Sequence, residues 1–248
     1  MKVGGRGAEA CPPARAAPTL ADQIRKRALG LGFDLVGFTS AQPPPHAAEF
    51  GQWLADGFLG ELGYLARRAA ERIEPGKVLP GARSVVVIGL NYNNPRPAAL
   101  TEQRPPGSDA PSSQTKERPP EGDAPLSPEG RIARYSWGAR DYHDLVGEKL
   151  AQLAGFIGRL GGQAKWYVDT GPVLERDLAQ RAGIGFIGKH TNLISRQLGN
   201  WLFLGEVLTD LELPPDKPEQ PHCGTCHRCL DACPTRAILA PYRLDARL

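Results

Sequence analysis

The stretch Ser-Val-Val-Val-Ile-Gly-Leu, residues 84–90, is the clearest strand signal in the sequence. Four β-branched residues follow one another in it without polar alternation, which is typical of a strand that is buried on both faces. We therefore predict that residues 84–90 run through the middle of a sheet, and that the rest of the fold is arranged around them.

Segments on both sides alternate between helical and strand patterns. Thr19 is a predicted N-cap. Apolar spacing and turn residues predict helices over 20–31, 46–54, 62–73, 141–160 and 173–182, and further strands over 33–38, 165–169, 193–195 and 201–209. One face of the third helix would carry Leu62, Leu65, Ala69 and Ile73, and the inward face of the fourth would carry Leu145, Leu150, Leu153 and Ile157. The predicted fold class is α+β, with a mixed sheet flanked by helices and a small cysteine-rich unit after it.

Composition divides the chain further. Residues 1–18 are rich in Ala, Pro, Gly and Arg and are expected to be a disordered tail, while 95–130 are dense in Pro, Ser, Glu, Gln and Gly and are expected to be a flexible insertion. The main domain would then be 19–213 and the cysteine unit 214–248. The 248 residues carry a formal net charge of only +3, so any nucleic-acid surface would have to be a local basic patch. No apolar run reaches the ~18 residues that span a bilayer, and no signal peptide is visible, so we expect a cytoplasmic protein without a membrane partner.

The cysteines are concentrated in CGTCHRCLDACP, residues 223–234. Cys223, Cys226, Cys229 and Cys233 have the spacing C-x2-C-x2-C-x3-C with a proline next, which is the bacterial ferredoxin run that binds a [4Fe-4S] cluster. The alternative is zinc, which prefers two C-x2-C pairs separated by a longer loop. The compressed spacing favours the cluster. Cys11, in the predicted tail, would be an unrelated free thiol.

In ferredoxins with two clusters, the fourth cysteine of such a run ligates the other cluster. No second cysteine run occurs before Leu248. Either Cys233 completes a single cluster or the polypeptide is truncated, and the expectation is truncation.

Two motifs in the main domain could carry chemistry. Residues 183–188, GIGFIG, match the dinucleotide pattern G-x-G-x-x-G, but a helix pattern precedes them and none follows, so we interpret them as a helix end and a tight turn. Asp169 ends a predicted strand, where a carboxylate can either serve chemistry or cap the next helix, and the sequence leaves both open. Glu175, Arg176 and Asp177 could simply be solvated, and Tyr142 and His143 could be a mere helix-start cluster.

Several segments together resemble the epoxyqueuosine reductase family. The resemblance is carried by residues 79–92, 130–150, 168–195, 201–213 and 223–238, and it runs from about Leu20 to the end, interrupted by the Pro-rich insertion. Each motif alone is weak, but their order and spacing are specific to that family.

The resemblance implies a cobalamin-binding catalytic domain followed by a partial ferredoxin-like iron–sulfur domain. Such enzymes reduce epoxyqueuosine to queuosine at the tRNA wobble position, with electrons passing from an external donor through two [4Fe-4S] clusters to cobalamin, the second cluster lacking its ligands here. By resemblance Asp169 is the catalytic acid, the cobalamin contacts are Asp169, Arg176, Lys189, Tyr135 and Arg72, and the protein is a monomer that binds the tRNA anticodon loop.

Two departures qualify these implications. The 95–130 insertion is longer than the usual connection, and the chain lacks the helical repeats that hold much of the tRNA surface in the family, so the fragment is expected to be weakened or inactive. Two other readings stay open: a non-catalytic iron–sulfur electron carrier, and a zinc-stabilised RNA-binding protein.

Overall fold

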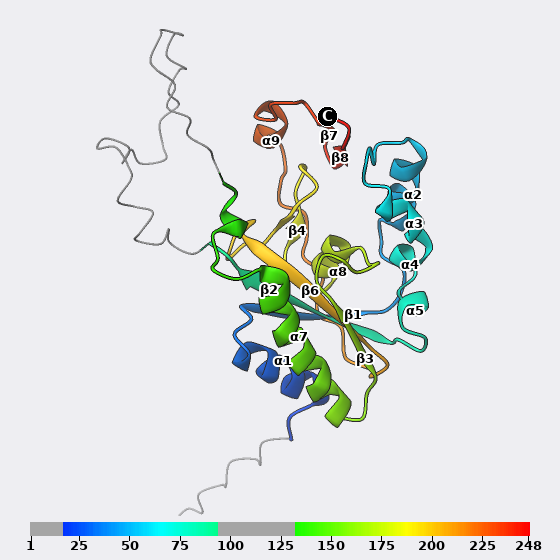
Figure 1. The fold of residues 1–248 in the computed structure, drawn as a ribbon, viewed down its shortest axis with the longest axis vertical. Coiled ribbons are helices and arrows are strands. Elements are labelled where there is room, and N and C mark those ends of the chain that lie inside the picture. Colours follow the sequence, from blue (N-terminus) through cyan, green and yellow to red (C-terminus); the bar gives the residue numbers. More distant parts are fainter. Residues whose placement is uncertain (1–16, 94–131) are drawn as a thin grey trace, which may run out of the picture.

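The computed structural model describes residues 17–93 and 132–248 (Figure 1). The predicted insertion, Cys11 and almost all of the predicted tail lie outside these residues. Within the described ranges, no helix combines the length and the apolar character that crossing a membrane requires.

The described part of the chain is built around a four-stranded sheet in the order β1 (Leu35–Ser40), β2 (Ser84–Asn91), β6 (Leu202–Thr209) and β3 (Ala164–Tyr167). Residues 84–90 lie in a central strand, as predicted. The prediction of a mixed sheet was wrong, because every neighbouring pair in this sheet is antiparallel. β2 and β3 do run in the same direction, joined by a helical crossover, but β6 is inserted between them and pairs antiparallel with both.

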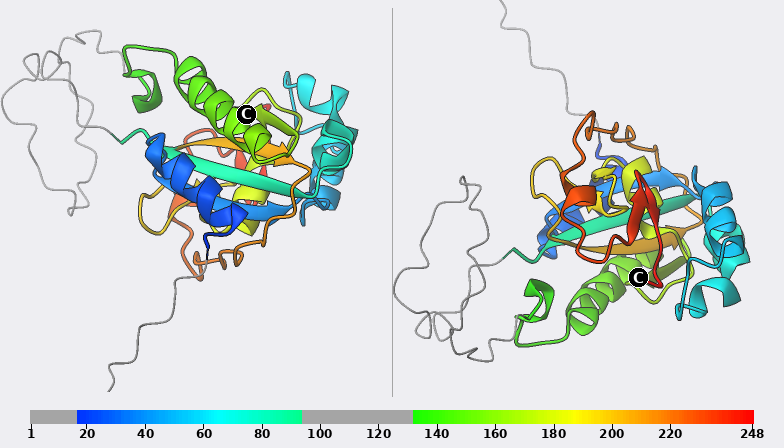
Figure 2. Two further views of the ribbon diagram at one scale, coloured as in Figure 1. Left: turned by 90° about the horizontal axis from the view of Figure 1, so that it is seen from below. Right: turned by 90° about the horizontal axis from the view of Figure 1, so that it is seen from above.

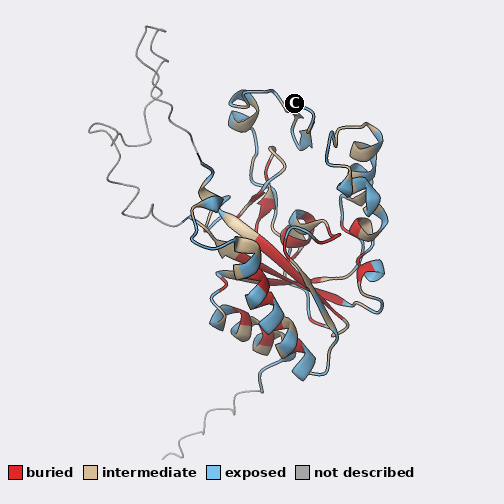
Figure 3. Ribbon diagram, viewed as in Figure 1, coloured by how far each residue is buried: buried red, intermediate tan, exposed pale blue. Residues whose placement is uncertain are grey.

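Helices cover both faces of the sheet (Figures 1 and 2). On one face lie α1 (Leu20–Gly30) and α7 (Tyr142–Arg159), which pack on Val86, Ile88 and Val207. On the other lies α8 (Glu175–Arg181), which packs on Val85, Val87 and Leu208. The alternating side chains of β2 are thus buried in two separate cores, which explains its uninterrupted apolar run (Figure 3).

Local sequence signals predicted most ends of helices and strands to within a few residues of where the structure has them. Thr19 caps α1 in a capping box with Asp22, and Asp141 caps α7 by accepting a hydrogen bond from the His143 N–H. Leu150, Leu153 and Ile157 are fully buried, as predicted; Leu145 is only partly buried, and Val146 next to it is buried instead.

The prediction of one continuous helix over 62–73 was wrong. It is broken at Arg68, whose backbone is not helical, into α3 (Tyr64–Arg67) and α4 (Ala69–Ile73). The residue of this segment that turns fully inward is Arg72 rather than the predicted apolar face, because its guanidinium has acceptors in the interior. With α2 (Ala47–Ala55) and α5 (Pro75–Val78), these helices form the β1–β2 connection, which lies beside the sheet (Figure 1).

The cysteine segment contains α9 (Arg228–Asp231) and a hairpin of β7 (Ile238–Ala240) and β8 (Arg243–Leu244). The Trp53 indole N–H donates to the Leu244 carbonyl at 2.6 Å, and the Ala246 N–H donates to the Phe58 carbonyl at 2.8 Å. The hairpin is therefore fastened to the β1–β2 connection, and its turn is also held by the Tyr242 N–H, which donates to the Lys189 carbonyl at 2.9 Å.

Candidate active site

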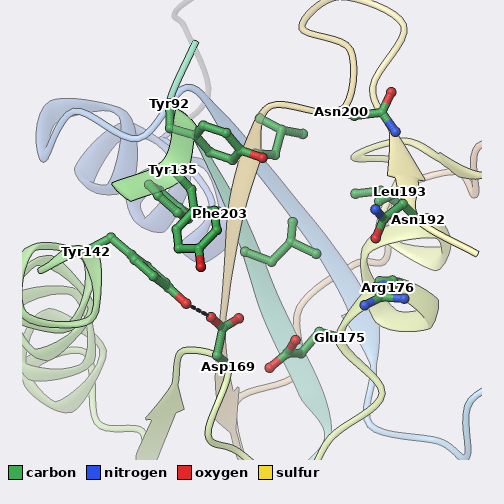
Figure 4. Close-up of a pocket in the computed structure, with 12 residues that line it drawn as sticks. Tyr92, Tyr135, Tyr142, Asp169, Glu175, Arg176, Asn192, Leu193, Asn200 and Phe203 are labelled. Carbon is green, nitrogen blue, oxygen red and sulfur yellow. Dashed lines mark hydrogen bonds between the residues drawn. The ribbon is translucent and has the colours of Figure 1, made fainter. Parts of the chain in front are cut away.

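A cavity of about 340 Å³ opens at the end of the sheet near β5 (Leu193–Ile194) and the short helix η1 (Arg134–Ser136) (Figure 4). One side carries aromatic rings and the other carries amide and guanidinium groups, with two carboxylates at the bottom of the view. Its lining consists of Tyr92, Tyr135, Tyr142, Asp169, Glu175, Arg176, Asn192, Leu193, Asn200, Leu202, Phe203 and Leu204.

Asp169 lies in the loop after β3, with its carboxylate in the cavity (Figure 4). Its φ of 51° falls in the left-handed region, which non-glycine residues seldom adopt outside functional sites and turns. The Tyr142 hydroxyl donates a hydrogen bond to its Oδ2, and His143 Nε2 lies 3.7 Å from the same oxygen. Burial, together with the hydrogen bond to Asp169, raises the pKa of Tyr142, so the phenol stays protonated and acts as a donor. Of the two residues at the helix start, Tyr142 therefore lines the cavity, and His143 lies next to the Asp169 carboxylate.

The loop that carries Asp169 is braced from behind by Arg72. Its Nη1 donates to the carbonyls of Gly171 at 3.1 Å and Val173 at 3.2 Å. Burial lowers the pKa of this guanidinium, which is only 6% exposed. Glycine is required at position 171, because a Cβ there would lie 2.5 Å from the Cβ of Tyr167. The loop conformation is thus fixed by specific contacts on both sides.

Glu175 begins α8 and turns its carboxylate toward the same end of the cavity as Asp169 (Figure 4). Its Oε1 is shielded from solvent and has no hydrogen-bond partner among the described residues. Burial, then the charge of Asp169, raises the pKa of Glu175 to about 7. The reading of Glu175 as a solvated surface residue was therefore wrong. Asp177 is also buried, where it accepts a hydrogen bond from the His46 N–H.

The polar wall opposite the aromatic rings comes from α8 and the segment around β5 (Figure 4). The Arg176 guanidinium donates to the Thr191 carbonyl at 2.9 Å, and Thr191 has a φ of 69°. Asn192 and Asn200 extend their amides along this wall. Amide and guanidinium groups here can bind carbonyl or phosphate oxygens of a ligand.

The glycine motif at 183–188 forms the helix end and tight turn that the sequence predicted, and not the strand–turn–helix of the dinucleotide fingerprint. Gly183 follows α8 with a φ of 74°, the left-handed conformation that glycine commonly adopts just after the end of a helix. The motif then enters β4 (Phe186–Ile187), and not a helix. A Cβ on Gly185 would lie 2.5 Å from the Ile194 carbonyl oxygen, so the close approach is to the β5 backbone.

Lys189, just after that motif, faces the cysteine loop. Its Nζ donates to the carbonyls of Gly224 at 2.7 Å and Cys226 at 2.8 Å. Hydrogen bonds from backbone N–H groups, that of Ile238 most strongly, lower the pKa of the Cys233 thiol. A thiolate is the form that binds iron or zinc. Among the described residues, no three His, Cys, Asp or Glu side chains are gathered closely enough to hold a metal ion, so the four cysteines share one short segment, with Cys229 in α9, without converging.

The structure brings together three of the five predicted cofactor contacts: Tyr135, Asp169 and Arg176 line the cavity. Arg72 lies behind the Asp169 loop, and Lys189 lies against the cysteine loop. The roles assigned to all five remain predictions.

Comparison with known proteins shows which family the chain belongs to. The family model "Epoxyqueuosine reductase QueG, DUF1730" matches residues 72–170. An epoxyqueuosine reductase from Gloeobacter violaceus is 42% identical over 235 residues, which are 93% of this chain and 64% of that protein. The epoxyqueuosine reductase of Atelocyanobacterium thalassa is 30% identical over 236 residues, 92% of this chain and 67% of that protein. The chain belongs to the epoxyqueuosine reductase family. The resemblance drawn from its motifs is thereby confirmed.

A solved epoxyqueuosine reductase, in complex with a stem loop of tRNA-Tyr modified with epoxyqueuosine, has the same fold with a TM-score of 0.73 and 32% identity. The match covers 92% of this chain and 55% of that chain. The present chain thus spans between half and two thirds of these epoxyqueuosine reductases.

Sequence reasoning did not assign Glu175 or Tyr142 to the site, and it overlooked Glu206, an acid of β6 that is fully buried beneath α8. A signal for Glu206 was present, because it is the single charged residue within the apolar strand pattern 201–209. Tyr142 and Asp169 are 27 positions apart, and no local pattern connects them.

Proposed function

We propose that this chain carries the catalytic chemistry of epoxyqueuosine reduction, in which the epoxide of the modified tRNA base becomes an alkene. The observation that carries the proposal is the Asp169 carboxylate, held in the cavity by the Tyr142 hydroxyl and a braced loop. Membership of the family supports the substrate class.

The reaction converts an epoxide, two electrons and two protons into an alkene and water. When the C–O bonds break, the oxygen must be protonated before it can leave as water, so a positioned acid is needed. Asp169 is our candidate for that acid, and general acid catalysis of this kind contributes roughly 10²–10⁴-fold in rate. Tyr142 would orient the carboxyl group through its hydrogen bond.

We also propose that the domain binds cobalamin as an electron-transfer group. Bound cobalamin would supply two-electron reducing chemistry that no amino-acid side chain offers. The cavity fits one part of such a ligand: aromatic rings line one wall, and Arg176, Asn192 and Asn200 supply donors that suit the peripheral amides of a corrin. We propose that Tyr135, Asp169 and Arg176 line that site, with Arg72 and Lys189 supporting it through the loops they hold.

A [4Fe-4S] cluster is proposed on Cys223, Cys226, Cys229 and Cys233, as in the ferredoxin run. The donor set fits, because four thiols lie within eleven residues of one segment, three of them partly buried, and backbone N–H groups favour the thiolate of Cys233. An external low-potential reductant would deliver electrons to this loop.

The proposed partner is a tRNA anticodon loop whose modified base enters the cavity. Bases that undergo chemistry are commonly turned out of their stack into a pocket with aromatic walls. The aromatic side formed by Tyr92, Tyr135 and Phe203 suits such a base. The solved relative bound to a modified stem loop supports this choice of partner.

The test is a single-turnover assay under anaerobic conditions. The chain is loaded with iron, sulfide and cobalamin, supplied with a low-potential reductant, and mixed with an epoxyqueuosine-modified stem loop. We expect queuosine to form in the wild type, and Asp169→Asn to reduce the rate by about 10²-fold or more while cobalamin binding is retained. Asp144→Asn, an exposed substitution on α7, is the matched control. Wild-type turnover by the Asp169 variant would refute the assignment of the acid.

A further inference from the structure

Glu206 is a carboxylic acid in the middle of an apolar core. It lies in β6 between Leu204 and Leu208 on the face that α8 covers, and its cross-strand neighbours are Val87 and Tyr167. Its side chain is 0% exposed, and neither carboxyl oxygen has a hydrogen-bond partner among the described residues. A charge buried without a partner costs several kcal/mol or more, so such a group takes up a proton instead.

The titratable groups that face this carboxyl are themselves acids. Of these acids, Glu175 of α8 raises the pKa of Glu206 more than Asp169 of the loop after β3 does. The cations of the surrounding elements donate elsewhere: Arg72 of α4 to the carbonyls of Gly171 and Val173, and Arg176 of α8 to that of Thr191. Lys165 of β3, on the same face of the sheet as Glu206, donates to the Val78 carbonyl at 3.2 Å. No cation of the described residues lies within ion-pair distance of Glu206. Burial and then Glu175 raise the pKa of Glu206 well above its ordinary value.

The acids extend from the core to the cavity. Glu206 is wholly enclosed, Glu175 is partly buried with one carboxyl oxygen shielded, and Asp169 reaches the cavity. Glu175 also lines the cavity, so it has contact with both environments (Figure 4). Glu175 therefore stands between the enclosed Glu206 and the cavity that holds Asp169. No hydrogen bond joins Glu206 to either acid among the described residues, so a proton leaving Glu206 would pass through a bridging water or a side-chain rotation.

We infer that Glu206 stores the second proton of the reaction and that Glu175 passes it to Asp169. The inference rests on the proposed function and deepens it. Reduction of the epoxide consumes two protons for two electrons supplied by a low-potential one-electron reductant: Asp169 gives the first to the epoxide oxygen, and the array returns a proton to Asp169 so that the same oxygen leaves as water. Glu206 and Glu175 act through Asp169. Each turnover takes two protons from the three acids, one held at first by Asp169 and one by Glu206, and solvent restores both through the cavity.

The first arm of the test needs neither substrate nor cofactor. Infrared spectra of the full chain at neutral pH should contain the C=O stretch of a protonated carboxyl group that shifts in D₂O. The component of the band that comes from Glu206 should be lost in Glu206→Gln, leaving only what Glu175 contributes with its pKa of about 7. The whole band should persist in Glu61→Gln, an exposed control. Absence of the band from the wild type overturns the inference, and this holds even if the Glu206 variant fails to fold.

The second arm is the pH dependence of single-turnover reduction by the loaded chain. Glu206→Gln preserves shape and removes the stored proton, so we expect a rate about tenfold lower and a profile that falls at lower pH than in the wild type. Glu206→Leu suits the apolar core and serves as the structural control; it should be stable and equally slow. A wild-type rate and profile in both variants overturns the inference. A wild type that does not reduce the epoxide at all refutes the proposed function instead.

Discussion

The Tyr142 hydroxyl, at the first residue of α7, donates a hydrogen bond to Oδ2 of Asp169, in the loop after β3. The Tyr142 ring stacks on Phe203 with the centroids 4.1 Å apart and an interplanar angle of 2°. A donor whose ring is fixed in this way can hold the carboxyl group in one orientation, even though the aspartate lies in a strained turn.

Removing this donor should slow the chemistry and leave the fold intact. We expect Tyr142→Phe to lower the single-turnover rate about tenfold, since the carboxyl loses its orientation while the ring stack remains. Cobalamin affinity, measured by titration of its visible absorption, should stay within about twofold. Tyr242→Phe, an exposed residue beside the C-terminal hairpin, is the control. A rate equal to wild type would show that the hydrogen bond does not orient the acid.

Replacing Arg72 should lower the stability of the fold even when no ligand is bound. In Arg72→Met the carbonyls of Gly171 and Val173 lose their buried donor, so we expect the free energy of unfolding to fall by roughly 1–3 kcal/mol. Denaturant titration measures the change, and Arg67→Met, an exposed residue of α3, provides the comparison. If the two variants have equal stability, the bracing contacts contribute nothing measurable.

Lys189 should hold the cysteine loop in place. Its Nζ contacts two carbonyls of that loop, so Lys189→Met should loosen the segment between Cys223 and Cys226. We expect anaerobically loaded protein of this variant to lose iron several-fold faster on exposure to air, as followed by iron analysis and the visible absorption. Lys217→Met, an exposed lysine in the preceding linker, should behave like the wild type. Unchanged iron loss in Lys189→Met would contradict the role.

The buried acids should make stability depend on pH with a definite sign. Because the pKa of Glu206 is raised on folding, the native state keeps a proton that the unfolded chain releases above about pH 4.5, and stability falls as the pH rises. Glu175 adds to this loss up to its pKa of about 7. Relative to the wild type, Glu206→Gln should therefore gain stability from pH 4.5 upward, by at most about 1.4 kcal/mol per pH unit. Chemical denaturation at several pH values measures this difference, and a constant difference would contradict the burial of an ionisable group.

Local patterns in the sequence were sufficient for the separate elements. The β-branched run at 84–90 predicted a central strand, and Thr19 and Asp141 marked helix starts. The ferredoxin-type cluster indicated by the cysteine spacing at 223–233 stays a prediction. Each of these signals depends on residues a few positions apart, whose backbone geometry and hydrogen bonding are decided by near neighbours. The order of several such motifs also sufficed to suggest the family.

Tertiary structure alone decided how these pieces meet. β6 separates β2 from β3, the 62–73 helix breaks so that Arg72 can reach Gly171 and Val173, and Tyr142 reaches Asp169. The same packing encloses Glu206 beneath α8 and gives the Asp169 loop two acidic neighbours. Periodicity specifies which side of a strand or helix is apolar, but the partner of that side is set by contacts between residues far apart in sequence. Burial, and with it the protonation of an acid, therefore depends on the complete fold.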